Sequence, residues 1–349
     1  MMNRMTVVTL LLVAVAFVVV PPATAQLVTD WGDTPTGRDG AAIDPRMDFA
    51  HPAWGYWVKR VGLSEFPFLK IGQGARGEAM GGAFVAVGDD ITAAFWNPAA
   101  LAHIDGGAYT LNYTRWLANS YLVSGAMALN VGFGVIGVNV ISFAAEEFEV
   151  TTPTAPWGSG TKAQVGDIAI GAQFAKRMTD KFMLGGQIRW VQEDLYLEKV
   201  SNVDYAVSSF FYTGFKSARI AMGFRNLGPD VKVTEGGFTS SMPITFSLGA
   251  AMEVYGDKGS PSYATLGYEH EMMTDYQAVN RVGVEMWLQN MLALRAGYRH
   301  GFELEDWSLG FGLKYEVVPD KPISLDVSYH NEKLGFFDAP IRVSLGGAF

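Results

Sequence analysis

The sequence predicts an all-β fold: a transmembrane barrel of about fourteen antiparallel strands, with a glycine-rich segment ahead of the first strand. Three observations predict it. The chain opens with an export-type segment, alternating apolar and polar residues recur from Ala108 onward, and the last residue is Phe349. No later stretch is long and apolar enough for a membrane-spanning helix, so strands are the expected spanning elements.

Residues 1–25 have the pattern of a cleaved signal peptide. Arg4 supplies the positive end, residues 6–20 are apolar, and small residues precede Gln26. Because a barrel exported in this way is a component of the outer membrane, we expect that location, with membrane lipid and the barrel assembly machinery as partners.

Composition excludes several classes of site. The chain has no cysteine, which excludes disulfides, thiolate metal sites and cysteine nucleophiles. Its formal net charge is −9, which argues against nucleic acid as a partner. We therefore expect no cofactor and no catalytic activity of these kinds.

Residues 26–67 are rich in proline, glycine and aspartate, which predicts an irregular extension with few regular elements. Two interpretations stay open for it. It forms a tail or an extra layer on the segment that follows, or it is a partner-binding arm that uses Trp54, Tyr56 and Trp57.

Residues 68–107 differ from everything after them and predict a compact plug, or hatch, held inside the barrel. Glycines at this density let backbone pack closely, and two short capped helical turns follow them. Asp89 or Asp90 can cap the first turn, and Asn97 with Pro98 begins the second. Its run from Phe68 to Leu101 has six glycines, at positions 72, 74, 77, 81, 82 and 88, of which Gly72, Gly74, Gly81 and Gly82 are predicted plug residues.

Residues 108–349 form the predicted barrel, because segments of nine to fourteen residues alternate in polarity between turn signals. Every second connection between consecutive expected strands is short, whereas the remaining connections include the long stretches 145–162 and 227–242. This asymmetry is typical of outer-membrane barrels. The expected strands are 108–116, 120–130, 132–144, 163–176, 182–193, 203–214, 217–226, 243–255, 262–271, 279–288, 291–300, 305–316, 322–331 and 339–349.

The alternation also assigns residues to faces. Leu294 and Tyr298 share one side of their strand, while Arg295 and Arg299 share the other, and Arg281 and Glu285 oppose apolar residues in the preceding strand. These lumen charges, with Lys314 and Glu316, fit either an ion-pair ladder that ties the plug to the wall or a path for a substrate with an acidic head group.

Aromatic residues add two expectations. The apolar final strand ends at Phe349, which is typical of the C-terminal signal read during outer-membrane assembly. Aromatic residues near strand ends suit the interfacial girdles of a barrel, although packing in the core explains any one of them equally well; they are Trp116, Trp190, Tyr255, Trp287, Trp307 and Tyr329.

Sequence motifs for chemistry are weak. Gly72-Gln73-Gly74-Ala75-Arg76-Gly77 satisfies G-x-G-x-x-G, but no alternating β/α pattern surrounds it, so we do not expect a dinucleotide site. Asp89 and Asp90 lack a further acidic ligand at fixed spacing, which favours capping over metal binding. We therefore expect no metal site and no enzyme.

The run from Phe68 to Leu101, with Met80-Gly81-Gly82 and Trp96-Asn97-Pro98, resembles the N-terminal signature of the PorV/PorQ family of outer-membrane proteins. Arg225-Asn226-Leu227-Gly228-Pro229 and Leu294-Arg295-Ala296-Gly297-Tyr298 also resemble it. The family is similar in turn to FadL-type transporters, whose N-terminal hatch carries a comparable Asn-Pro-Ala element.

The resemblance implies two functions. The resemblance to PorV/PorQ proteins implies a non-enzymatic barrel associated with type IX protein secretion, which holds or hands over cargo. Its expected partners are secretion-system proteins or secreted cargo. The FadL likeness implies diffusion of hydrophobic small molecules, such as long-chain fatty acids. A secretion component is expected to have a tightly filled lumen and exposed aromatic loops at Trp157 or Phe238. A transporter is expected to have an apolar tunnel along Phe84 to Phe95, with a kinked strand facing it.

Overall fold

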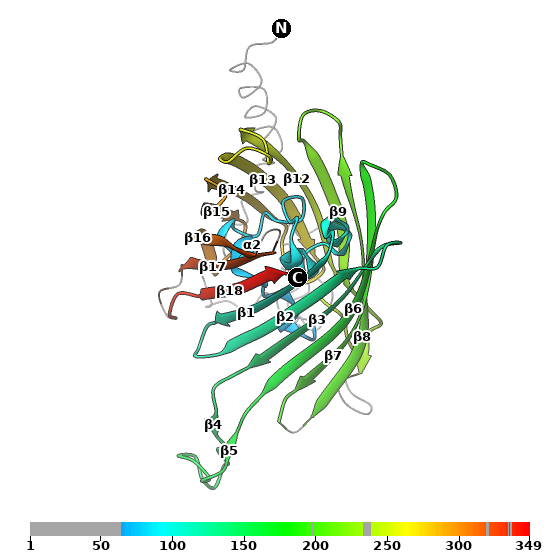
Figure 1. Cartoon of the computed structure of the whole chain (residues 1–349). Helices are drawn as coiled ribbons and strands as arrows, with labels where there is room; N and C mark the ends of the chain where they lie inside the picture. Colours follow the sequence, from blue (N-terminus) through cyan, green and yellow to red (C-terminus); the bar gives the residue numbers. More distant parts are fainter. Residues whose placement is uncertain (1–63, 197, 233–238, 319–320, 334, 336) are drawn as a thin grey trace, which may run out of the picture. The chain divides into compact units, whose positions relative to one another are not determined.

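Fourteen antiparallel strands close into a barrel (Figure 1). The structure is a computed structural model that describes residues 64–349 apart from 197, 233–238, 319–320, 334 and 336. The first and last strands pair in register from Ala108 with Ala348 to Arg115 with Ile341, which completes the ring. The predicted strand number and barrel class are confirmed.

Each expected strand has a counterpart, with boundaries that shift by a few residues. The wall consists of β1 (Gly107–Arg115), β2 (Tyr121–Asn130), β3 (Val135–Ala144), β6 (Gly166–Arg177), β7 (Phe182–Asp194), β8 (Lys199–Tyr212), β9 (Arg219–Leu227), β12 (Thr245–Tyr255), β13 (Tyr263–Met273), β14 (Val279–Leu288), β15 (Leu292–His300), β16 (Glu305–Val318), β17 (Lys321–Glu332) and β18 (Ile341–Ala348).

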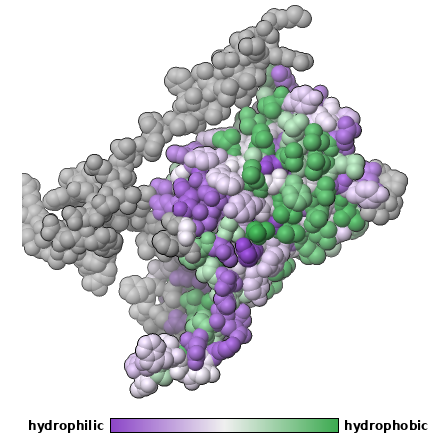
Figure 2. All heavy atoms as spheres, turned by 90° about the vertical axis from the view of Figure 1, so that its left-hand side faces the viewer, coloured by the Kyte–Doolittle hydropathy of each residue, from purple (hydrophilic) through white to green (hydrophobic). Residues whose placement is uncertain are grey.

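Alternating side chains give the wall an apolar outside and a polar inside. In β15, Leu294 and Tyr298 are exposed while Arg295 and Arg299 are buried, and β14 follows the same rule. Because side chains of a strand alternate between faces, one face can meet lipid while the other meets the lumen. Figure 2 shows apolar side chains gathered on one outer face with hydrophilic residues at its border.

Two of the six expected girdle residues face inward instead. Trp287 is buried, with the Arg295 guanidinium 5.6 Å from its ring, and Trp116 lies under the guanidinium of Arg342. These aromatic residues hold arginines in the lumen. For these two the core-packing alternative is correct, because each continues the inward-facing alternation of its strand.

The long connections all lie at one end of the barrel. Residues 145–165 contain the hairpin of β4 (Phe148–Glu149) and β5 (Lys162–Ala163), and residues 228–244 contain β10 (Val231–Lys232) and β11 (Thr239–Ser240). We call the end with these connections the outer end and the opposite one, where β1 begins and β18 ends, the inner end. In outer-membrane barrels the long connections face the exterior.

The segment ahead of β1, residues 64–106, runs inside the ring of strands, and we call it the inner segment (Figure 1). It contains four short helices: η1 (Pro67–Lys70), α2 (Ala75–Ala79), η2 (Ile91–Phe95) and η3 (Pro98–His103). Helix α2 contacts β15 to β18, whereas η3 contacts β6 to β8 across the lumen.

Two apolar clusters surround the inner segment. One contains Phe84, Leu101 and Ile104 with wall residues near the inner end, including Met183 and Phe210. The other contains Phe66 and Phe68 with wall residues near the outer end, including Leu122, Ile141 and Val191. The hydrophobic core therefore lies within the barrel, in contrast to the lipid-facing apolar surface.

Several predictions fall outside the described residues: the signal peptide over 1–25, most of the extension over 26–67 with Trp54, Tyr56 and Trp57, and Phe238. Among the helices that the structure describes, none has the length and apolar character needed to cross a membrane.

Candidate functional site

The turns of the inner segment are fixed by their own caps. The Asp90 side chain accepts a hydrogen bond from the Thr92 amide at the start of η2. The Asn97 side chain accepts one from the Ala99 amide at the start of η3, and its amide nitrogen donates to the Val85 carbonyl at 2.9 Å. Such caps satisfy helix-end amides that would otherwise be buried without partners.

Glycines bring the inner segment and the wall into backbone contact. Gly81 has a φ of +67° and lies against Gly297 of β15, where a Cβ added to Gly297 would overlap the Gly81 amide. A Cβ at Gly283 of β14 would overlap Met80 in the same way. Gly72, Gly74 and Gly82 belong to the same segment, and the last two also have positive φ. Glycine is required here because a side chain would occupy the space of the opposing chain.

One buried network joins the inner segment to β14, β15 and β17. The Arg76 guanidinium binds both oxygens of Glu285, at 2.8 and 2.7 Å. Arg295 binds the same carboxylate at 2.6 Å and Asp326 at 2.7 Å. Removing one member would leave an uncompensated buried charge, which is strongly destabilising.

A second network surrounds Glu78, which is 1% exposed. Its Oε2 lies 2.7 Å from Arg299 and 2.9 Å from Arg342, and Arg299 also pairs with Glu305. In the part of the chain that the structure describes, Glu78, Glu305 and His330 are the one group with ligand atoms close enough for a metal ion. The two guanidiniums already neutralise the carboxylates and would repel a cation, so the group fits an ion-pair cluster better than a metal site.

Two buried acids of β13 have different partners: Glu269 holds the loop before η2, and Glu271 pairs with arginines of the wall. The Glu269 carboxylate accepts hydrogen bonds from the Phe84 and Val85 amides, at 3.0 and 2.9 Å. Glu271 pairs with Arg281 at 2.5 Å and with Arg225 at 2.9 Å. Neither these acids nor Glu78 and Arg342 are among the site residues predicted from the sequence. For Glu269, Glu271 and Arg342, a position on the inward face of an alternating strand was the signal that could have identified them.

A β-bulge places Arg225 and Asn226 on the same side of β9. The register with β8 shifts between Tyr205 and Val207, and Asn226 has a φ of +58°. As a result the Arg225 guanidinium lies 5.7 Å from the Trp96 ring, and the Asn226 side chain accepts from Arg189 at 2.6 Å and donates to the Pro243 carbonyl. The bulge therefore aims two polar side chains into the lumen.

The inner segment is anchored at both ends of the barrel. At the outer end, Lys70 and Ser64 both contact Asp275 in the β13–β14 connection. Burial alone would raise the pKa of Asp275, but hydrogen bonds from Lys70 and Ser64 hold it below its usual value. At the inner end, Asp89 pairs with Lys258 at 2.6 Å; burial opposes ionisation, yet Lys258 and Arg76 hold the Asp89 pKa well below its usual value.

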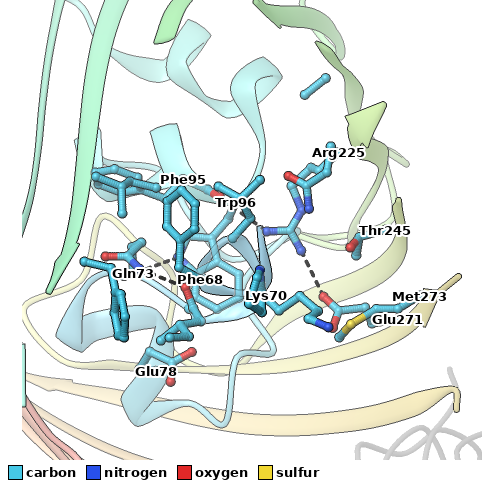
Figure 3. A pocket seen from close by; sticks show the side chains of 18 of the residues that line it. Phe68, Lys70, Gln73, Glu78, Phe95, Trp96, Arg225, Thr245, Glu271 and Met273 are labelled. Carbon is cyan, nitrogen blue, oxygen red and sulfur yellow. Dashed lines mark hydrogen bonds and ion pairs between the residues drawn. The ribbon is translucent and has the colours of Figure 1, made fainter. Parts of the chain in front are cut away.

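A cavity of about 370 Å³ lies between the inner segment and the wall in the outer half of the barrel. Aromatic and aliphatic side chains line much of it, among them Phe68, Trp96 and Phe143, together with several arginines. Figure 3 shows Phe68, Phe95 and Trp96 near the ion pair of Arg225 with Glu271. Cavities of this volume can hold a small ligand.

The other feature at the outer end is an exposed aromatic finger, which we define as residues 145–165 around the β4–β5 hairpin. Trp157 near its tip is 95% exposed, and Phe148 is 45% exposed. A tryptophan left so far in solvent has no packing role in the isolated chain. Exposed aromatic residues of this kind are enriched at protein-binding surfaces.

Comparison with solved structures places the barrel among known folds. The toluene transporter TbuX of Ralstonia pickettii is 12% identical, with a TM-score of 0.55 over 78% of this chain and 97% of that one. The P. putida toluene transporter TodX is 12% identical, with a TM-score of 0.53 over 79% and 97%. A FadL homologue of Pseudomonas aeruginosa is also 12% identical, with a TM-score of 0.50 over 80% and 98%. At these identities the likeness shows the fold alone.

Sequence comparison is more specific. No curated protein matches the chain. The family model described as type IX secretion system protein PorV matches residues 58–269, which is more than half of the sequence and includes the inner segment and the strands up to β13. The chain is an outer-membrane β-barrel with a FadL-like fold, and it belongs to the PorV family of type IX secretion system proteins.

Proposed function

We propose that this protein is a non-enzymatic component of type IX secretion that handles or anchors secreted proteins at the outer surface. In this proposal the loops of the outer end contact the secreted proteins. The inner segment is a fixed plug that includes Gly72, Gly74, Gly81, Gly82, Asp89, Asp90, Asn97 and Pro98. Cleavage of residues 1–25 and recognition of Phe349 by the assembly machinery belong to the same proposal.

The observation that carries the proposal is how the lumen is filled. A fourteen-strand barrel is wide enough to leak unless something occupies its bore. Here the inner segment is joined to the wall by buried ion pairs of Arg76 and Glu78 and by backbone contact at Gly81, and its Phe84 side chain is fully buried. These contacts support the ladder interpretation of Arg281, Glu285, Arg295 and Arg299.

Site-specific crosslinking tests the role of the outer end. A photoreactive amino acid replaces Trp157 in intact cells, and a second variant carries it at Leu309, which faces outward at 52% exposure on the wall. We expect secretion partners or surface cargo to attach at position 157 and not at 309. Equal labelling at both positions, or attachment of lipid alone, would contradict the proposal.

The alternative is a channel for hydrophobic solutes, which the cavity favours because apolar side chains line it. A channel also needs a path past Phe84, Val85 and Leu101, which are at most 1% exposed and lie in the cluster near the inner end. Uptake of a fatty acid into liposomes that contain the purified barrel distinguishes the two functions: a rate above that of empty liposomes would favour the channel.

A further inference from the structure

Three lysines lie together where the neighbouring strands β6 to β9 meet the inner end of the barrel. Lys176 follows Phe174 in the outward-facing series of β6, and Lys181 and Lys216 lie in the β6–β7 and β8–β9 connections. All three are exposed. The two connections are adjacent, since a Cβ added to Gly214 would lie 3.0 Å from the Lys181 Nζ. We call these three lysines the basic rim.

The charge of the basic rim is not neutralised within the described chain. None of its lysines forms an ion pair with a described residue, and Asp180 is the one acid in the two connections. Elsewhere at the inner end the charges balance or are absent. Lys258 of the β12–β13 connection pairs with Asp89, the β2–β3 and β14–β15 connections carry no charged residue, and residues 314–321 contain two lysines and two acids. The uncompensated positive charge is therefore concentrated in the sector from β6 to β9.

Apolar side chains continue from the basic rim onto the outside of the wall. Leu184 of β7 is opposite Lys176 of β6, faces outward and is 39% exposed. Phe182 and Phe211 are opposite each other on β7 and β8, with ring centroids 6.5 Å apart. Lysine stems lie along apolar surface while their ammonium groups stay at the water boundary. A ligand that contacts both parts has apolar chains along the wall and an anionic head at the rim.

The position of this sector limits what that ligand can be. Strands β6, β7 and β8 lie side by side (Figure 1), and the outward residues between them belong to the lipid-facing surface and not to the lumen. Because neighbouring strands are about 4.8 Å apart, β6 to β9 span roughly 14 Å of wall, which is enough for one lipid. The inner end faces the periplasm if the long connections face the exterior. The amphiphile found at that boundary is a phospholipid of the inner leaflet.

We propose that the sector from β6 to β9 binds one anionic phospholipid of the inner leaflet on the outside of the barrel. The phosphate lies among Lys176, Lys181 and Lys216, and the acyl chains lie against Leu184 and Phe211. Clusters of basic residues at a membrane surface attract anionic lipids, and charge-assisted hydrogen bonds to the phosphate strengthen the contact. The lipid is a fixed partner of the wall and neither a solute nor cargo, so the proposal does not depend on the role in secretion.

Native mass spectrometry of the purified protein in detergent micelles measures the preference. The probes are dioleoyl phosphatidylglycerol and dioleoyl phosphatidylethanolamine, which have the same acyl chains and differ in net charge. We expect the anionic lipid to be retained about tenfold over the zwitterionic one, and the triple variant Lys176→Gln, Lys181→Gln, Lys216→Gln to reduce this ratio to about two or less. The charge-matched control replaces three exposed lysines of the outer end by glutamine and should keep the ratio within about twofold; they are Lys199, Lys232 and Lys333.

A second measurement locates the lipid. Because the chain has no cysteine, a fluorophore can be attached at Leu184→Cys, and at Met286→Cys as the control, which also faces outward but lies on β14. We expect phosphatidylglycerol with brominated acyl chains to quench the first fluorophore more than the second, and brominated phosphatidylethanolamine to quench both equally.

All variants are first checked for a folded barrel by heat-dependent mobility on gels. If the triple variant of the basic rim did not fold, the double variant Lys181→Gln, Lys216→Gln would replace it, since both residues lie in turns. Equal retention of the two lipids, equal loss in the two triple variants, or equal quenching at positions 184 and 286 by the anionic lipid would overturn the proposal. An acidic protein that the rim variant loses, without any lipid preference in the native chain, would also overturn it and assign the rim to a protein partner.

Discussion

At the scale of single residues, Asn226 shows how one position directs a whole region. It occupies the left-handed backbone region at the β9 bulge, and its side chain bridges Arg189 and the Pro243 carbonyl. Asparagine tolerates this conformation better than other non-glycine residues. The bulge turns Arg225 toward Trp96. This explains why two consecutive residues, Arg225 and Asn226, are both polar: both side chains reach the lumen.

We predict that Asn226→Ala destabilises the barrel by about 2–4 kcal/mol, because it combines backbone strain with loss of two buried hydrogen bonds. Unfolding in denaturant, followed by tryptophan fluorescence, measures the change. Asn202→Ala is the control: Asn202 also bonds a backbone carbonyl, that of Pro229, but it has no positive φ. A loss no larger than that of the control would show that the bulge does not depend on Asn226.

Asp275 gives a prediction that depends on pH. Its pKa is below the usual value in the folded protein because Lys70 and Ser64 stabilise the carboxylate. A lowered pKa means stabilisation that is present above about pH 4 and is lost as pH falls through the folded-state pKa. We expect Asp275→Asn to reduce the thermal stability of the barrel at pH 7 and to make little difference near pH 2. Thermal unfolding at both pH values checks this, with Asp338→Asn as an exposed control. If Asp275→Asn lowered the melting temperature as much at pH 2 as at pH 7, the prediction would be contradicted.

At the scale of elements, wall and inner segment fit because glycines lie where they touch. Helix η3 packs against β7 at Gly185, where an added Cβ would overlap the Ala99 backbone. The adjacent Gly186 faces outward, and its Cβ would have only an ordinary contact at 3.6 Å with the Ala206 carbonyl. Two neighbouring glycines in one strand therefore have different roles.

This contrast supplies a matched pair of substitutions. Gly185→Ala should destabilise the protein by about 1–3 kcal/mol, because the methyl group overpacks against η3 and displaces it. Gly186→Ala should be nearly neutral. Denaturant unfolding of the two variants, together with protease sensitivity of the inner segment, is the measurement. Equal effects would mean that close approach at Gly185 does not hold η3 in place.

At the scale of the whole molecule, the inner segment runs lengthwise through the barrel. Its first residues contact the outer end at Asp275 and Ser241, and its later residues contact the inner end, where Asp89 meets Lys258 and the Ile104 carbonyl accepts from Asn130. The direction of the chain is therefore outer to inner before β1 begins. Pro67 is exposed at one mouth and Asp105 at the other.

Because the chain has no cysteine, this direction can be tested with single-cysteine variants and a membrane-impermeant maleimide. In intact cells we expect labelling of Pro67→Cys and of Ser159→Cys in the aromatic finger. Asp105→Cys and Asp180→Cys, at the inner end, should react only after the outer membrane is opened. Labelling of Pro67→Cys only in opened membranes would reverse the assigned direction.

The wall was largely predictable from the sequence. Alternation with a period of two assigned Arg295 and Arg299 to the inside and Leu294 to the outside, since that period is set by local backbone geometry. The caps at Asp90 and Asn97 were also readable, because a cap depends on its nearest neighbours. The same alternation places Trp287 on the inward face with Glu285, so only its packing against Arg295, and that of Trp116 against Arg342, required the tertiary structure.

By itself the sequence determined the strand number, the two faces of the wall and the family, since each rests on local pattern or on a continuous run of residues. Only the tertiary structure decided which charges meet. The pairing of Arg76 with Glu285, 209 residues apart, and of Glu78 with Arg342 depends on where closure of the ring places each strand around the inner segment. No local pattern encodes that juxtaposition, because buried ion pairs and a cavity form only when segments distant in sequence enclose the same space.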